Sequence, residues 1–426
     1  MTTSDRADRW ARGFLWFALL TSLLGFLGYY NARGFVTPPP FFVLALQLIA
    51  VGGGALVLRR RLLKNVRGIM PLIMVAGWAA LTLLWADDPT TAIRRWLLVF
   101  VPAILLCALA AHDARPRHSF TWFTVLVVII TLASGAFSAV VLAVSDQTAL
   151  GDSLRYVLVD LNGWTFGIAE GGRQYVDLGL YVPRFSGLTS NPNSMGLLAA
   201  VGLIALCAIA TPKRDLRGVA LIIVLALVTI LLLLSASRAA IAMGGTGILF
   251  VILLRTGRRR TAQGAALVIG VMVPLLYLVT YLSGVAPDPG NAEILELRER
   301  AQVWRVAMRA IDDVWPFGLG FGLIQEAVYT PLGLETAAHS ITLSMFVETG
   351  VVGLALVLVT WFQPVFKTTR PGQTMTTTDI AVVSLLMALF VHQAVDSSVF
   401  RYHWAHFVFV YLLGVSAGLA GSRTSE

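Results

Sequence analysis

Residues 217–256 read RGVALIIVLALVTILLLLSASRAAIAMGGTGILFVILLRT. Two apolar runs, 217–235 and 239–256, are separated by only a few small or polar residues and one arginine, Arg238. Each run is close to the ~20 apolar residues that a helix needs to cross the hydrocarbon core of a bilayer. This stretch therefore predicts two membrane-spanning helices joined by a very short turn.

Apolar runs of similar length recur along the whole chain. The 426 residues are 57% hydrophobic and only 13% charged, with a mean hydropathy of +0.78. Soluble domains carry about 25% charged residues, so a soluble enzyme and a disordered chain are excluded. The alternating segments of ~10 residues that build an outer-membrane barrel are not found. The predicted fold class is an all-α polytopic membrane protein with about 12 transmembrane helices, over 13–31, 41–58, 68–86, 95–112, 120–145, 190–211, 217–235, 239–256, 264–283, 338–363, 378–396 and 404–422.

These runs divide the chain into three membrane segments and two long loops. We expect N-terminal membrane helices in 1–145, a first loop in 146–189, central membrane helices in 190–283, a second loop in 284–337 and C-terminal membrane helices in 338–426. Loops of this length are usually functional or independently structured, although they can also simply cap the bundle. In the second loop, apolar residues three and four positions apart predict an amphipathic helix over 292–315 that lies along the membrane surface.

The distribution of positive charge predicts the orientation. If the runs alternate across the membrane, 20 of the 32 Lys and Arg residues fall on the same side as the N-terminus. Cytoplasmic loops are enriched in Lys and Arg, so both termini are assigned to the cytoplasm and both long loops to the outer face. The first run follows Arg6, Arg9 and Arg12 without a small-residue cleavage site, so we expect an uncleaved anchor. The net charge of +9 then reflects topology, and no nucleic acid partner is expected.

His339 is the first candidate for chemistry, because it lies at the outer end of a predicted helix. Thr336 can cap that helix, which would place His339 in its first turn. The positive end of a helix disfavours an imidazolium, so His339 is expected to stay neutral and to be available as a base. The alternative is an interfacial histidine that is hydrogen-bonded to water.

Arginines at the outer ends of helices form a second group of candidates: Arg94, Arg95, Arg184, Arg238, Arg300 and Arg401. A guanidinium group matches phosphate oxygens two at a time, so several of them on one face would bind a diphosphate. Any one of them could equally be an arginine whose head reaches the lipid headgroups. The acidic pairs Asp87-Asp88 and Asp312-Asp313 are adjacent residues that point about 100° apart on a helix, so no metal is expected. Nucleotide-binding and serine-hydrolase motifs are absent, and no cofactor is expected.

Taken together, these residues resemble a known family. His339-Ser340, nine further residues and Gly350-Val351-Val352-Gly353 resemble the signature of bacterial O-antigen ligases, which belong to the O-antigen ligase and polymerase superfamily. Further similar stretches are Arg184 with Asn191-Pro192-Asn193, Arg238 with Ala242 in place of an expected leucine, Arg300 through Gly322, and Asp396. The resemblance covers about 184–396.

The resemblance implies a GT-C-like, metal-independent, inverting glycosyltransferase of the bacterial inner membrane, with its active site facing the periplasm. The donor would be O-antigen on undecaprenyl diphosphate, the acceptor a sugar hydroxyl of lipid A–core, and the surrounding membrane lipids would be further partners. His339 would orient or deprotonate the acceptor hydroxyl, while Arg238 and Arg300 grip the diphosphate. Asp396 would orient His339 or an arginine. The remaining substrate-binding candidates are Arg184, Ser340 and Arg401.

Three other functions stay open. An O-antigen polymerase would use the same donor with a second lipid-linked glycan as acceptor, and only the histidine-led signature favours a ligase over it. A protein O-oligosaccharyltransferase would differ again only in its acceptor. A transporter of lipid-linked glycans would be expected to show internal repeats and charges in the middle of the membrane. The polar residues of this chain instead gather at one face, which favours an enzyme.

Overall fold

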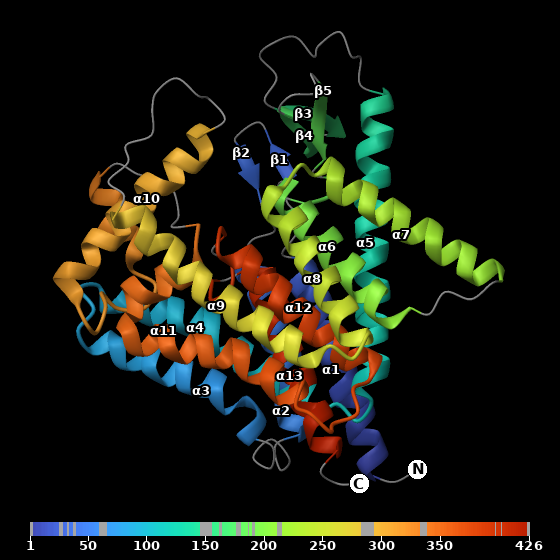
Figure 1. The fold of residues 1–426 in the computed structure, drawn as a ribbon, viewed down its shortest axis with the longest axis horizontal. Helices are drawn as coiled ribbons and strands as arrows, with labels where there is room; N and C mark the ends of the chain where they lie inside the picture. Colours follow the sequence, from blue (N-terminus) through green and yellow to red (C-terminus); the bar gives the residue numbers. More distant parts are fainter. Residues whose placement is uncertain are drawn as a thin grey trace.

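The structure of the protein is a computed structural model (Figure 1). It describes residues 3–24, 29–31, 34–36, 40–58, 66–144, 156–161, 164–175, 180–185, 187–189, 192–210, 215–282, 294–332, 339–396, 398–401 and 403–423.

Helices dominate the described residues. They are α1 (Thr3–Leu24), α2 (Pro40–Leu58), α3 (Val66–Leu81), α4 (Pro89–Ala111), α5 (Pro116–Val144), α6 (Pro192–Ile209), α7 (Leu216–Leu234), α8 (Arg238–Arg255), α9 (Arg259–Leu282), α10 (Ile294–Val314), α11 (Ile341–Thr368), α12 (Thr377–Gln393) and α13 (Trp404–Arg423), with short turns η2 (Thr82–Leu84), η4 (Gln325–Tyr329) and η5 (Thr330–Leu332). Each of the twelve predicted apolar runs overlaps one of these helices. Within the described residues, seven helices are long and apolar enough to cross a membrane. The predicted all-α polytopic membrane fold is confirmed, while the number of twelve crossings stays a prediction.

Helix α12 forms the centre of the bundle and packs against α6, α8 and α11 (Figure 1). Nearly all of its side chains are buried, whereas α7 exposes Ile222, Ile223 and Ile230. Both helices are apolar on every face, so their sequences alone do not separate a central helix from one that faces lipid. The difference is set by the neighbours that each helix meets in the fold.

Close packing between α4 and α13 depends on small residues. A Cβ atom added at Gly414 or Gly418 of α13 would meet backbone atoms of Cys107 or Ala111 on α4. The four-residue spacing of the two glycines places them on the same face of the helix. In a membrane, where lipid is as apolar as a side chain, this close approach stabilises helix pairs through van der Waals contact.

A five-stranded antiparallel sheet lies at one end of the bundle, at the top of Figure 1. Its strands are β1 (Tyr29–Asn31), β2 (Gly34–Val36), β3 (Tyr156–Leu161), β4 (Trp164–Tyr175) and β5 (Leu180–Phe185), in the order β2-β1-β4-β3, with β5 also pairing with β4. This sheet was not predicted, because residues 146–189 were expected to form a polar loop and residues 13–31 an apolar run. Strands this short do not produce a membrane-length apolar run.

Helix α10 packs its apolar stripe against the bundle. Val303, Trp304, Ala307 and Ile311 are buried, and Arg309 on another face is exposed. The helix contacts α9 and α11. The apolar side of α10, which repeats every 3.6 residues, therefore faces the protein over these residues.

Candidate functional site

His339 lies immediately before α11 and is held in an unusual backbone conformation. The helix begins at Ile341 with Ser340 as its N-cap, and the Ser340 hydroxyl accepts a hydrogen bond of 3.3 Å from the Leu343 amide. His339 is half-buried and has a φ of 46°, which is uncommon for a residue with a side chain. The prediction that His339 occupies the first turn is therefore wrong, since Ser340 takes the capping role. Thr336 lies outside the described residues.

Arg238 is positioned by the same local motif. Ser237 is the N-cap of α8, and its hydroxyl accepts a hydrogen bond of 3.4 Å from the Ala240 amide. The preceding residue, Ala236, has a φ of 48°, as His339 does before its own serine cap. The Arg238 side chain, on the first helical residue, is exposed. Backbone strain of this kind concentrates at functional sites, so both turns are candidates for one.

Asp396 lies in the loop between α12 and α13, surrounded by histidines. Burial raises the pKa of its carboxyl group, but the nearby imidazoles of His392, His403 and His339 outweigh that effect. The net pKa is below the ordinary value of 3.8, so Asp396 is a carboxylate at neutral pH. Burial lowers the pKa of His403 to about 4, so its imidazole is neutral. The His339 imidazole is one of the groups whose charge interaction lowers the pKa of Asp396; the role of Asp396 in orienting His339 or an arginine stays a prediction.

Gln393 fixes the conformation of this loop. Its side-chain oxygen accepts hydrogen bonds from the amides of Ser398 and Val399, at 2.9 and 2.8 Å. Its side-chain nitrogen donates to the Ser398 hydroxyl at 2.7 Å. Because Gln393 is fully buried at the end of α12, these bonds hold the loop that carries Asp396 against the bundle.

Arg401, in the same loop, forms an ion pair with Glu348 of α11. Its two terminal nitrogens donate to the two carboxylate oxygens at 3.0 and 2.7 Å, and Glu348 is completely buried. Glu348 also accepts a hydrogen bond of 3.3 Å from the Ile324 amide. This bidentate geometry is the strong form of an arginine–carboxylate contact. Arg401 was predicted to bind substrate, and the structure shows a protein partner for its guanidinium group.

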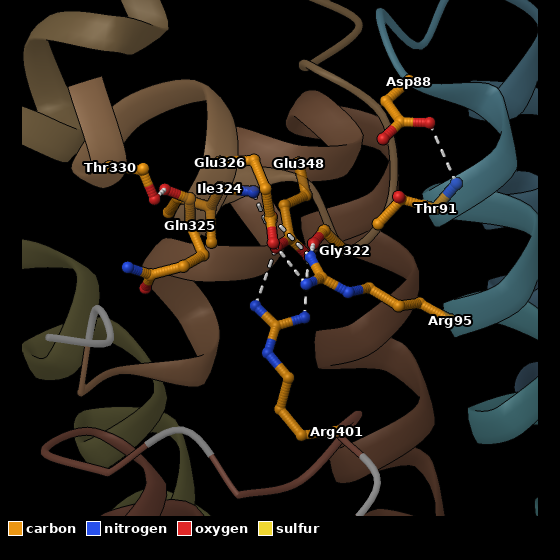
Figure 2. A network of polar contacts seen from close by, with 10 residues as sticks. All are labelled: Asp88, Thr91, Arg95, Gly322, Ile324, Gln325, Glu326, Thr330, Glu348 and Arg401. Atoms are coloured by element: carbon orange, nitrogen blue, oxygen red, sulfur yellow. Dashed lines mark hydrogen bonds and ion pairs between the residues drawn. The ribbon is translucent and has the colours of Figure 1, made fainter. Parts of the chain in front are cut away.

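A second ion pair lies beside the first. Arg95 of α4 donates to both carboxylate oxygens of Glu326, at 2.6 and 2.5 Å, and also to the Gly322 carbonyl. Figure 2 shows the guanidinium groups of Arg95 and Arg401 approaching these carboxylates from different elements. Together the four side chains connect α4, η4, α11 and the α12–α13 loop.

The first glycine of the histidine-led signature, Gly350, allows a crossing of two backbones. Gly350 interrupts α11 with a φ of 67°, and a Cβ atom there would collide with the Pro316 carbonyl. That carbonyl accepts a hydrogen bond of 3.1 Å from the Val351 amide. Nearby, the Gly320 amide donates to the Glu348 carbonyl at 2.9 Å. The turn after α10 therefore replaces helical hydrogen bonds that the kink removes.

The structure brings some of the predicted site residues together. His339, Ser340, Asp396 and Arg401 are placed by α11 and the adjoining α12–α13 loop, which the Arg401–Glu348 pair connects. The Ser340 hydroxyl, predicted to bind substrate, caps α11 and contacts the Thr342 hydroxyl at 3.1 Å. Arg300 lies on α10 and Arg184 on β5, but their side chains are outside the described part.

Sequence reasoning missed Glu348, Glu326, Gln393 and His403. Glu348 had a usable signal, because it is an acidic residue inside the predicted membrane run 338–363, and charges in such runs usually have a task. Glu326 lies in a long loop and had no comparable signal. Within the described residues, no group of three His, Cys, Asp or Glu side chains is arranged to hold a metal ion. A metal-free reaction remains a prediction.

Comparison with known proteins agrees with the residues that carry the resemblance. Residues 223–358, about a third of the chain, match the family described as O-antigen ligase. No curated protein matches the chain. The matched segment contains α8, α10 and most of α11, and hence Arg238, Arg300, His339 and both signature glycines, Gly350 and Gly353. The predicted resemblance is confirmed: this segment is similar to the O-antigen ligase family.

Proposed function

We propose that this protein is an O-antigen ligase of the bacterial inner membrane. It moves O-antigen polysaccharide from undecaprenyl diphosphate to a sugar hydroxyl of lipid A–core on the periplasmic face, and both of its termini are cytoplasmic. The observation that carries this proposal is the placement of His339 near the carboxylate of Asp396, at the start of the helix that bears the family signature. The reaction is inverting and uses neither metal nor cofactor.

In this proposal His339 is the general base. Its imidazole takes the proton of the acceptor hydroxyl as that oxygen attacks the anomeric carbon of the donor sugar. The nearby Asp396 carboxylate orients the ring and stabilises the imidazolium that forms, as the carboxylate does in a Ser-His-Asp triad. General-base help of this kind contributes ~10²–10⁴-fold to the rate.

Arginines stabilise the leaving group. Arg238 and Arg300 contact the diphosphate, and Arg184 is a further ligand for donor or acceptor. Fixed guanidinium charges meet the negative charge that grows on the departing diphosphate, which removes the need for a metal. Each such contact is worth ~2.7–4 kcal/mol in the transition state, by analogy with a lost oxyanion donor. The exposed position of Arg238 at the start of α8 supports this role.

Ser340 and Arg401 contribute by position. The Ser340 cap fixes the first turn of α11 next to His339. The Arg401–Glu348 pair ties the loop of Asp396 to the same helix. Helix α10 shapes the entrance for the acceptor. A catalytic pair held by neighbours in this way needs no rearrangement when the substrates bind.

A lipopolysaccharide gel from a null strain complemented with variants of this gene tests the proposal. Wild type should restore O-chains on lipid A–core, and His339→Ala should leave the core bare while its abundance in the membrane stays normal. His112→Gln is the matched control. His112 caps the C-terminal end of α4, the end far from Arg95, and its variant should restore O-chains on lipid A–core. O-chain attachment by His339→Ala would contradict the assignment of the base.

The same gel separates the related enzymes. A null strain that still attaches single repeat units would identify a polymerase, whereas loss of glycan from proteins alone would identify a protein O-oligosaccharyltransferase. Reconstitution in liposomes separates an enzyme from a transporter, because an enzyme releases undecaprenyl diphosphate and a transporter relocates unchanged substrate.

A further inference from the structure

A groove lies between the second half of α1 and the first half of α5. It has a volume of about 600 Å³ and is lined by Arg12, Trp16 and Leu20 of α1 and by His118, Trp122 and Ile129 of α5. Figure 1 shows this part of α1 beside α5, at the end of the molecule where the N-terminus lies. Nothing in the proposed transfer reaction uses it.

The body of the groove is apolar and lies at the surface of the bundle. Leu20, Trp122 and Ile129 are 43%, 53% and 57% exposed, and such exposure in a membrane helix places them toward lipid. At 1.5 Å per residue, the α1 wall from Arg12 to Leu20 rises ~12 Å and the α5 wall from His118 to Ile129 ~16 Å. Half of a ~30 Å hydrocarbon core is ~15 Å. The groove thus has the length of one leaflet and of one acyl chain within it.

One end of the groove is basic. Arg12 uses its Nε to pair with Asp113 at 3.3 Å, and a guanidinium group has five N–H donors in total. Trp122 donates from its indole nitrogen to Nε2 of His118 at 3.1 Å, which leaves Nδ1 as the donor of that imidazole. The exposed residues Arg115 and Arg117 precede His118 on the chain. Positive charge therefore collects where a lipid headgroup would lie.

We propose that this groove binds one anionic phospholipid of the leaflet that contacts the start of α1. The phosphate is held at Arg12 and His118, and one acyl chain runs between Trp16 and Trp122 toward Leu20 and Ile129. Charge complementarity selects an anionic lipid over a zwitterionic one, and the match to one leaflet selects a lipid over a soluble anion. This site is independent of the proposed reaction.

Native mass spectrometry of the full chain, delipidated and titrated with phosphatidylglycerol or phosphatidylcholine, tests the proposal. Wild type should retain one phosphatidylglycerol more tightly than phosphatidylcholine, by about fivefold for each basic residue involved. Arg12→Gln should reduce that preference by about this factor, whereas His118→Ala removes a neutral hydrogen-bond donor to the phosphate and should lower the retention of both lipids. His118 is exposed, so its variant keeps the test valid if Arg12→Gln, which also breaks the pair with Asp113, fails to fold.

A second pair of variants tests the acyl-chain part. Leu20→Trp fills the groove and should lower retention of both lipids, whereas Ile223→Trp, at an exposed site on α7, should not. Arg260→Gln removes an exposed arginine at the start of α9 and should leave the preference unchanged. Equal retention of the two lipids by wild type would overturn the proposal. So would a change of oligomeric state in Leu20→Trp, because it would show that a second copy of the chain occupies the groove.

Discussion

Two groups of polar side chains near the start of α11 differ in how their charges are satisfied. The arginine–glutamate cluster consists of Arg95, Glu326, Glu348 and Arg401, and each guanidinium group in it holds a carboxylate by two nitrogens. The histidine–aspartate cluster consists of His339, His392, Asp396 and His403. It contains one carboxylate and several imidazoles, groups that exchange protons readily.

This difference indicates a division of work between the two clusters. Bidentate arginine–glutamate pairs resist separation, which suits them to hold helices and loops together. An imidazole beside a carboxylate can accept a proton during a reaction, which suits it to chemistry. The Arg401–Glu348 pair connects the two clusters, because its arginine shares a loop with Asp396. Variants of each cluster should therefore fail in different ways.

The largest effect is expected for His339→Ala. Loss of the general base should reduce transfer by at least ~10²-fold and as much as ~10⁴-fold, with little change in the unfolding temperature. Release of undecaprenyl diphosphate by purified protein measures the rate, and His112→Gln serves as the control. A loss of thermal stability equal to that of a variant in the arginine–glutamate cluster would remove the distinction between the clusters.

Asp396→Asn should have the next largest effect. Loss of the analogous aspartate in a serine protease triad costs ~10⁴-fold, and we expect a reduction of about 10²-fold or more here. The folded-state pKa of Asp396 is lowered, so its contribution is present above pH 3.8 and is lost as the pH falls through the lower folded value. At neutral pH the carboxylate stabilises a protonated imidazole. Its removal should therefore shift the acid limb of the pH–rate profile to lower pH, and an unshifted limb would contradict an electrostatic interaction with His339.

Glu348→Gln tests the scaffold. Removal of one partner from a buried ion pair is destabilising by ~3–5 kcal/mol, because the other charge is left unpaired. Since Arg401 is 28% exposed, we expect the lower part of this range, measured as a reduced unfolding temperature in detergent. Replacing both partners, as Glu348→Gln with Arg401→Met, should recover part of the stability. If the losses in the free energy of unfolding caused by Glu348→Gln and by Arg401→Met simply add in the double variant, the two side chains are not coupled.

Glu326→Gln should have the smallest effect. Both partners of this pair are partly exposed, Arg95 at 36% and Glu326 at 43%, and exposed ion pairs contribute ~0–1 kcal/mol. Thermal unfolding should shift by little, and transfer activity should stay close to that of wild type. A loss as large as that of Glu348→Gln would mean that burial does not separate the two pairs.

Much of the architecture was predictable from local sequence. Each apolar run overlaps a helix, and the bounds agree to within about five residues except at the ends of α1 and at the start of α4. This succeeds because a helix in lipid must satisfy its own backbone and present an apolar surface over a fixed length. The sheet of β1 to β5 was missed although Asn162-Gly163, between β3 and β4, is a local hairpin signal. Only the pairing of Tyr30 with Thr165, between segments far apart in the chain, has no local pattern.

The candidate site was predictable only in part. His339 was found because a titratable group beside a signature of glycines stands out in an apolar chain, but its backbone conformation and the serine cap were not foreseen. Gly350 was recognised as part of that signature. The reason that a glycine is needed there is the Pro316 carbonyl, which lies against the kink in α11 and belongs to a distant segment. The partners of Arg95 and Arg401 were equally hidden from sequence reasoning.

Local sequence is enough to predict a helical membrane protein, the positions of its apolar helices and the residues of the histidine-led signature, because hydrophobic length and motif spacing are local properties. The tertiary structure decided which helix is central, which arginines are paired with carboxylates and which histidines surround Asp396. Those properties depend on contacts between residues far apart in the chain, and the low dielectric at buried positions makes such contacts decisive for charged groups.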